Sequence, residues 1–240
     1  MLVIFKKELS TFFSSLIGYL VLIVFLLATG LFLFVFDSDY NILSSGYANL
    51  DGLFILAPWV FLFLIPAIAM RFFSDESKSG TLELLLTMPV SDVSIVLGKF
   101  LAGLALLFFA LLPTIVYFIT VYALGSPVGN IDVGATIGAY LGLFLLGGIY
   151  LAIGTFISSL TENQIIAFIL TASICFVFYI GFDFVADMFT KFSFITNLGI
   201  NQHYNSISRG VLDSRDLIYF LGTIALFLYC TTLSLAKKRK

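Results

Sequence analysis

One short stretch of the sequence comes near to a phosphate-binding loop. Gly98, Lys99 and Phe100 stand where the end of the pattern G-x-x-x-x-G-K-[ST] would fall. In that loop glycines let the backbone wrap the phosphates, and the final Ser or Thr hydroxyl reaches the magnesium ion. Position 93, where the first glycine would stand, is Val, and position 100 is Phe. The sequence therefore predicts no ATP site on this chain.

The other residue types that carry chemistry are scattered. His203 is the single histidine, so there is no H-E-x-x-H motif, and no nucleophile is recognisably paired with a base. Cys175 and Cys230 lie far apart inside apolar runs, and we interpret them as packing residues. The sequence predicts neither catalytic residues nor a metal site.

Two carboxylates stand one helical turn apart near the end of an apolar run. Asp183 and Asp187 could receive a cationic group of a substrate. Carboxylates at such a place also mark the boundary between lipid and water. We favour the boundary role and leave the other open.

These polar residues are carried by a very apolar chain. Of its 240 residues, 60% are hydrophobic and 11% are charged, and the mean hydropathy is +1.11. Soluble domains are about 45–50% apolar and about 25% charged. A soluble fold could not bury so much apolar surface, so lipid is the expected solvent. The net charge of −2 leaves no basic excess for binding nucleic acid.

Six apolar runs are long enough to cross the hydrocarbon core as helices, which takes about 20 residues. They are residues 16–36, 53–70, 100–124, 137–160, 165–182 and 217–235. Their middles contain no Asp, Glu, Lys, Arg or His, which argues against an intramembrane enzyme because its catalytic groups would have to lie at that depth. The sequence predicts an all-α integral membrane protein with six transmembrane helices.

The basic residues fall mainly on one side of these six spans. Nine of the 12 Lys and Arg residues would share a side with both termini, and three would lie opposite. The nine are Lys6, Lys7, Arg71, Lys78, Lys99, Lys237, Lys238, Arg239 and Lys240; the three are Lys191, Arg209 and Arg215. Because basic residues collect in cytoplasmic loops, we expect both termini, with the basic tail 237–240, to be cytoplasmic.

Residues 1–15 form a candidate amphipathic helix on the inner membrane surface. At about 100° per residue an apolar arc opposes a polar face. The arc consists of Leu2, Phe5, Leu9, Phe12, Phe13 and Leu16. Such a helix lies in the headgroup region. The alternative is a straight extension of the first span, which we disfavour because Gly18 gives the chain a place to turn.

Three glycines, Gly134, Gly138 and Gly142, recur every four residues at the start of the fourth span. Small residues at this spacing let helix backbones approach closely. The helix that they face could belong to the same chain or to a second subunit, and we favour the first.

The outer segment 183–216 is too apolar for a free loop. Its apolar side chains include Phe192, Phe194, Ile195, Leu198 and Ile200. We expect short helices that cap the outer face or dip into the outer leaflet.

Other residues of the spans bear on movement and cargo. Pro58 and Pro66 in the second span and Pro113 in the third should bend their helices, either as hinges or as fixed bends. Trp59 and the many Tyr and Phe residues could line a cavity for a lipid-like or peptide cargo. Aromatic side chains also face lipid routinely, so the cargo stays undefined.

The segment 71–93 joins the second and third spans and combines charge with a short leucine-rich helix. Gly80 and Thr81 are good residues at a helix start, and Pro89 stops the helix. The charges keep the segment out of hydrocarbon, and the leucines are too apolar to stay in water. The helix would therefore either rest on lipid or dock into a groove of another protein.

The same segment carries a family signature. The pattern E-x-x-x-G-T-L-E-L-L-L-T-x-P-V, from Glu76 to Val90, resembles that of ABC-2 type transporter permeases. The similarity extends over nearly the whole chain, including Lys6-Lys7-Glu8, Ser158-Ser159-Leu160-Thr161 and Arg209-Gly210-Val211. Within the family, the chain is most similar to the gliding-motility permeases of Bacteroidetes. The permease of the nitrous-oxide reductase maturation cluster is a near relative.

The resemblance implies a transport subunit of the bacterial inner membrane, linked to gliding motility, that is not itself an enzyme. It implies a second permease chain, identical or related, and two copies of a cytoplasmic ABC ATPase that bind ATP and magnesium. Accessory membrane or periplasmic proteins could join them. The short helix would be a coupling helix seated in the ATPase. The contact residues implied are Glu76, Gly80, Thr81, Leu82, Glu83, Leu84 and Leu85.

A second function fits the same residues. The chain could be a membrane anchor or assembly platform for a motility or secretion machine, with the same fold and the same ATPase partner but no cargo. The sequence leaves this alternative open, and with it the cargo and the direction of transport.

Overall fold

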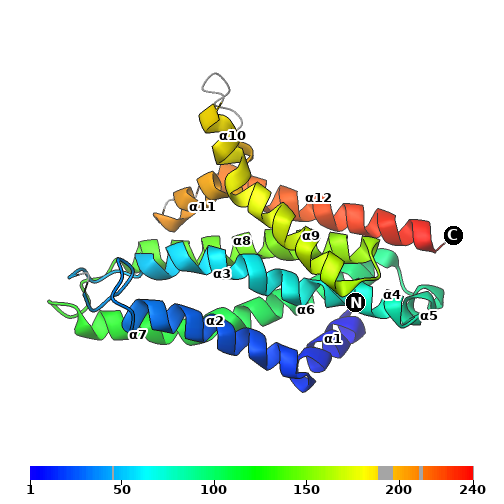
Figure 1. Ribbon diagram of the computed structural model, residues 1–240, viewed down its shortest axis with the longest axis horizontal. Helices are drawn as coiled ribbons and strands as arrows, with labels where there is room; N and C mark the ends of the chain where they lie inside the picture. The colour runs from blue at the N-terminus through cyan, green and yellow to red at the C-terminus, as the bar shows by residue number, and fades with distance from the viewer. Residues whose placement is uncertain (45, 189–196, 211–212, 240) are drawn as a thin grey trace.

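Helices make up all the regular structure in the computed structural model, which describes residues 1–44, 46–188, 197–210 and 213–239 (Figure 1). Five helices in these ranges are long and apolar enough to cross a membrane, and a sixth span results when the first two helices are counted as one bent span. The fold confirms the expected class, a helical membrane protein.

The chain begins with two helices joined at a sharp bend. The first is α1 (Leu2–Ser14) and the second is α2 (Leu16–Phe34), and the axis of α1 differs by 67° from that of α2 from Gly18 onward. Ser15 lies between them in an extended conformation, and its side chain accepts a hydrogen bond from the Gly18 N–H. A Cβ atom on Gly18 would collide with the carbonyl oxygen of Phe12. The turn that we predicted at Gly18 thus falls at Ser15, and Gly18 permits the close approach of the two helices.

The charged segment 71–93 comprises the end of one long helix, the short helix α5 and the start of the next long helix. In chain order the elements are α3 (Asp51–Ala69), α4 (Arg71–Lys78), α5 (Thr81–Thr87), α6 (Asp92–Leu111), the 3-10 turn η1 (Leu112–Thr114) and α7 (Ile115–Leu124). α3 and α4 form one helix of 28 residues, and α6 to α7 form one of 33 residues. α4 carries four charged side chains, so it extends beyond the hydrocarbon part of its helix.

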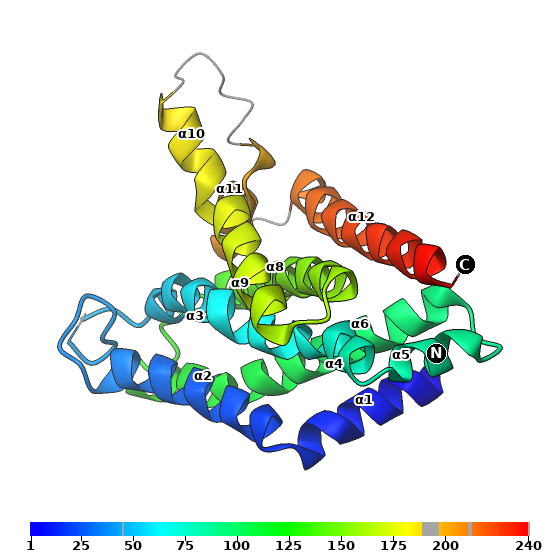
Figure 2. The same cartoon turned by 45° about the vertical axis from the view of Figure 1, so that its right-hand side comes forward.

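The second half of the chain is built around α8 (Val133–Leu160). It continues with α9 (Gln164–Phe176), the π-helical turn η2 (Val177–Gly181), α10 (Phe182–Met188), α11 (Ile200–Ser208) and α12 (Ser214–Lys238). α8 packs against α3, α6, α9, α11 and α12, and most of its side chains are buried. From this centre α10 and α12 diverge, as Figure 2 shows.

The first helix is attached to the rest of the protein. α1 packs against α6 and buries Ile4, Glu8 and Phe12, which recur every four residues. The apolar arc that we predicted for a membrane-facing helix only partly coincides with this buried face: Leu2 is 67% exposed and Leu16 is 80% exposed. α1 therefore has one face against protein, and within α1 the rest of the predicted arc is buried or half-buried.

The outer segment contains two short helices, α10 and α11. Ile200 of α11 is fully buried and Leu198 is exposed. Phe192, Phe194 and Ile195 lie outside the described residues. α11 packs on α8 and α12.

A hydrogen bond from α11 replaces one that is missing in α3 because of a proline. Pro58 has no N–H group, so the carbonyl of Phe54, four residues earlier, has no helical partner. The hydroxyl of Tyr204 in α11 donates to that carbonyl oxygen at 2.7 Å. This contact ties α11 to α3 at the position of Pro58.

Both ends of the described chain lie at the same end of the molecule, beside α4 and α5 (Figure 1). The connections from α2 to α3 and from α7 to α8 lie at the opposite end.

Candidate functional site

The helix α5 begins with a tight turn. Gly80 precedes it with a φ of +70°, in the left-handed region, where any other residue would be strained. No atom lies within 4 Å of the place where a Cβ atom of Gly80 would be. The backbone conformation alone, without any crowding, requires glycine here.

The side chains of α5 divide into an inner and an outer set. Leu82 and Leu86 are buried within the chain, and Leu85 is half-buried against the same core. Leu84 is 64% exposed, and Glu83 beside it is exposed. Of the three leucines that we expected to contact a partner, Leu82 is already used in the fold and Leu84 remains accessible.

Glu76, the first residue of the signature, turns toward its own chain. Its Oε1 atom accepts a hydrogen bond from Lys7 Nζ at 2.9 Å, and its Oε2 atom lies 3.0 Å from Lys99 Nζ. Lys99 also donates to Glu8 Oε1 at 2.7 Å. The side chain of Lys99 is 1% exposed. We call Lys7, Glu8, Glu76 and Lys99 the charge cluster; it joins α1, α4 and α6.

The charge cluster contains two ammonium groups and two carboxylates, so its charges balance. Burial alone would raise the pKa of the Glu76 carboxyl, but the charges and hydrogen bonds of Lys99 and Lys7 lower it below its ordinary value. Burial would lower the pKa of Lys7, but its hydrogen bond to Glu76 and the nearby carboxylates raise it above its ordinary value. Both shifts favour the charged forms. The stabilisation that Glu76 contributes is therefore present at neutral pH and is lost as the pH falls through its lowered pKa.

Sequence reasoning did not find this cluster. It assigned Glu76 to a partner and treated Glu8 and Lys99 only as charges on one side of the membrane. One signal was present: Glu8 stands midway between Ile4 and Phe12 at helical spacing. A charged residue on the buried stripe of a helix needs an opposite charge.

The three glycines of α8 do not share one role. A Cβ atom on Gly138 would come within 3.0 Å of Gly210 Cα and 3.1 Å of Ile207 O, and one on Gly142 would come within 3.1 Å of Ile207 Cγ2. Gly134 faces only the Asp132 side chain at 3.4 Å. Two of the glycines thus let α11 of the same chain approach α8.

The polar residues at the other end of the bundle are partnered within the chain. Asp183 accepts a hydrogen bond from Asn201 Nδ2 at 2.8 Å. His203 Nδ1 lies 2.6 Å from Asp216 Oδ1, and the His203 ring stacks on Tyr219 with 4.0 Å between centroids. The side chain of Asp187 lies outside the described part. These contacts fit a structural role for Asp183 and His203.

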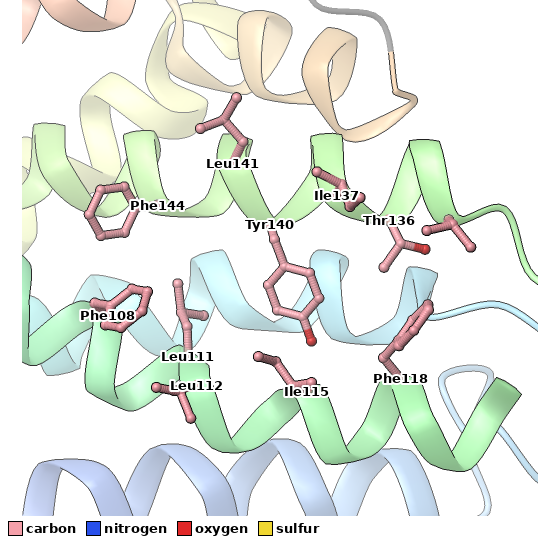
Figure 3. Close-up of a pocket in the computed structure, with 11 residues that line it drawn as sticks. Phe108, Leu111, Leu112, Ile115, Phe118, Thr136, Ile137, Tyr140, Leu141 and Phe144 are labelled. Atoms are coloured by element: carbon pink, nitrogen blue, oxygen red, sulfur yellow. The ribbon is translucent and has the colours of Figure 1, made fainter. Parts of the chain in front are cut away.

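A cavity of about 570 Å³ opens between α6–α7 and α8 (Figure 3). It is lined by Phe108, Leu111, Leu112, Ile115, Phe118, Val133, Thr136, Ile137, Tyr140, Leu141 and Phe144. Tyr140 points from α8 toward α7, and its hydroxyl donates to Thr114 O at 3.0 Å. The Thr136 hydroxyl donates to Asp132 O at 2.7 Å. Because both polar groups are engaged within the chain, the cavity presents hydrocarbon and no catalytic group.

No grouping suited to a metal ion was found in the described residues: nowhere do three His, Cys, Asp or Glu side chains converge. Cys175 is buried and Cys230 is half-buried, and both are free thiols. Trp59 is not among the residues that line the cavity; its ring packs edge-on against Tyr179 at 5.9 Å between centroids.

Comparison with known proteins places the chain in a family. No curated protein matches it. The sequence profile of the ABC-2 family transporter proteins matches residues 2–228, from the start of α1 to well into α12. Permeases of this family normally work with a cytoplasmic ABC ATPase. With its multi-pass helical fold and a match that covers nearly its whole length, the chain belongs to the ABC-2 family of transporter proteins.

Proposed function

We propose that this chain is the permease subunit that couples ATP hydrolysis on a separate ABC ATPase to export or conformational work across the bacterial cytoplasmic membrane. Family membership supports the transport role. The complete complex would contain two ATPase copies and a second permease chain, identical or related, with both termini and α5 in the cytoplasm. Gliding motility is the process that the signature residues suggest.

A single observation carries the ATPase contact: a fixed helix presents an accessible leucine. α5 has seven residues, too few for a stable isolated helix, so its tertiary contacts must hold it. Leu82 and Leu86 attach it to the core of the chain, while Leu84 is 64% exposed. A held helix with an outward leucine suits a contact with a partner's groove.

The helical connections explain how movement of α5 would reach the membrane. α5 follows α4, which is continuous with α3, and it precedes the long run from α6 to α7. A displacement of α5 by the closing ATPase pair would therefore act on two spans at once. Packed helices respond to such displacements by changing between discrete arrangements.

The test replaces the exposed leucine. In a complex purified from native membranes through a tag on this chain, Leu84→Asp should weaken ATPase binding at least about thirtyfold, because a buried anchor would become a buried charge. Glu83→Lys should weaken it as well. The readouts are the ATPase content by native mass spectrometry and the rate of ATP hydrolysis in lipid nanodiscs.

The matched control is Leu43→Asp, since Leu43 is 62% exposed and lies in the connection at the opposite end of the molecule. This variant should retain normal ATPase content and activity. If Leu84→Asp behaves like Leu43→Asp, α5 is not the ATPase contact and the proposed function loses its main support.

A further inference from the structure

The guanidinium group of Arg239 contacts the turn between α5 and α6 in three places. Its Nε atom donates to Leu86 O at 3.0 Å and its Nη2 atom to Val90 O at 2.9 Å. Its Nη1 atom lies 3.0 Å from Asp92 Oδ1. One side chain therefore gathers acceptors from the end of α5, the connecting turn and the start of α6.

The sequence of the turn explains why these acceptors are available. The last carbonyls of a helix have no partner within the helix. α5 ends at Thr87, and Pro89 follows two residues later without an N–H group of its own. Arginine has five N–H donors in a rigid plane and can serve several acceptors at once, whereas the ammonium group of lysine is a compact point charge.

Arg239 is itself held by a membrane helix. It follows α12 directly, and its N–H donates to Leu235 O at 3.0 Å. Leu235 is fully buried, and α12 packs against α8 and α6. Lys238, the preceding residue, is exposed, and its side chain makes no hydrogen bond or ion pair with any described residue. The position of Arg239 is therefore set by α12.

We propose that Arg239 is a positioning residue that fixes the end of α5 to α12. This inference rests on the proposed role of α5 as the ATPase contact. The segment that bears α5 is then held at both ends: Glu76, before it, binds Lys7 and Lys99, and Arg239 binds the turn after it. Together the two attachments set the direction in which Leu84 is presented.

Without Arg239, the end of α5 is held only by the packing of Leu86 and by its covalent connection to α6. α5 then samples several orientations, of which the ATPase binds one. Apparent affinity falls in proportion to the fraction of competent molecules. We expect Arg239→Gln to weaken ATPase binding about tenfold, the size of effect that hydrogen bonds to a charged group produce.

The first experiment measures the orientation of α5 without the ATPase. Spin labels replace Glu83 in α5 and Leu233 in α12, in a background with Cys175→Ala and Cys230→Ala, and the chain is placed in lipid nanodiscs. The unsubstituted chain and Lys238→Gln should give one narrow distance distribution. Arg239→Gln should broaden it, and Arg239→Lys should not restore it, although it keeps the charge. A distribution for Arg239→Gln as narrow as that of Lys238→Gln would overturn the inference.

The second experiment measures ATPase binding to the same variants in the complex. Arg239→Gln should lower the affinity about tenfold relative to Lys238→Gln and leave the KM of the bound ATPase for ATP unchanged. If Leu84→Asp abolishes binding but Arg239→Gln does not weaken it, positioning is refuted and the ATPase contact stands. If Leu84→Asp has no effect, the ATPase contact fails, and the distance distributions alone decide whether Arg239 fixes α5.

Discussion

Lys99 is a charged side chain that is almost completely buried, so its ammonium group must be paired within the protein. At 1% exposure its ammonium group has lost its hydration, and burying an ion costs several kcal/mol unless it is paired well. Two carboxylates meet it, Glu8 from α1 and Glu76 from α4. The ring of Phe73 lies 5.2 Å from Nζ and adds a cation–π contact. The ammonium group of Lys99 thus joins α1 and α4 to α6, in addition to the apolar packing of α1 and the hydrogen bond from Lys7 to Glu76.

We predict that Lys99→Met destabilises the protein by about 3–5 kcal/mol, because it removes the buried ammonium group that both carboxylates contact and leaves only Lys7 to balance the two negative charges. Unfolding in mild detergent, followed by circular dichroism, would measure the change. Adding Glu8→Gln and Glu76→Gln to Lys99→Met should recover part of the loss. The matched control, Lys78→Met on the exposed side of α4, should unfold like the unsubstituted chain. Equal stability of the Lys99→Met and Lys78→Met variants would contradict the account.

At the scale of elements, α11 supplies α3 with a hydrogen bond that α3 cannot make within its own helix. Pro58 removes the helical partner of Phe54 O, and Tyr204 supplies another at 2.7 Å. A buried carbonyl without a donor costs about 1–3 kcal/mol. The Tyr204 hydroxyl therefore contributes to stability because Pro58 leaves the Phe54 carbonyl without a helical donor.

A double-mutant cycle tests this dependence. Tyr204→Phe should cost about 1–3 kcal/mol in a chain that keeps Pro58, because Phe54 O is then left without a donor. In a Pro58→Ala background the new N–H group can satisfy that carbonyl, so Tyr204→Phe should cost clearly less. The unfolding free energies of the four variants give the coupling. Additive effects would show that the Tyr204 hydroxyl does not serve as a substitute for the missing N–H group.

The sequence was sufficient for the elements and insufficient for most of their contacts. Runs of apolar residues located the spans, and Gly80 and Pro89 marked the two ends of α5. These are local properties. The contacts that define the site join residues far apart in the chain: 91 positions separate Glu8 from Lys99, and 153 separate Leu86 from Arg239. Periodicity within a segment says which face is apolar, but the choice of partner depends on how whole helices pack.

At the scale of the whole molecule, the two ends of the bundle differ in what they carry. One end holds both termini, α5 and the charge cluster; the other holds the connection from α2 to α3, which contains Asp37 and Asp39 and leads to Asp51 at the start of α3 (Figure 1). The basic residues of the first end predict that it faces the cytoplasm.

Cysteine labelling in intact cells would test this orientation. We expect Leu43→Cys to react with a membrane-impermeant maleimide once the outer surface is accessible. Leu84→Cys should react only after the cytoplasmic membrane is permeabilised. Both leucines are similarly exposed, at 62% and 64%, so the pair is matched for accessibility. Labelling of Leu84→Cys in cells with an intact cytoplasmic membrane would mean that the protein is inserted the other way round.

The attachments around α5 have a consequence for protein engineering. A designer who moved residues 80–90 into another permease to change its ATPase would move Leu84 and Glu83 but leave behind the groups that hold them. Lys7 lies in α1, Lys99 in α6, and Arg239 directly after α12, so these groups are far apart in the sequence. The transferable unit is therefore a set of dispersed positions, and a chimaera should gain the donor's ATPase only when those positions are exchanged together with the loop.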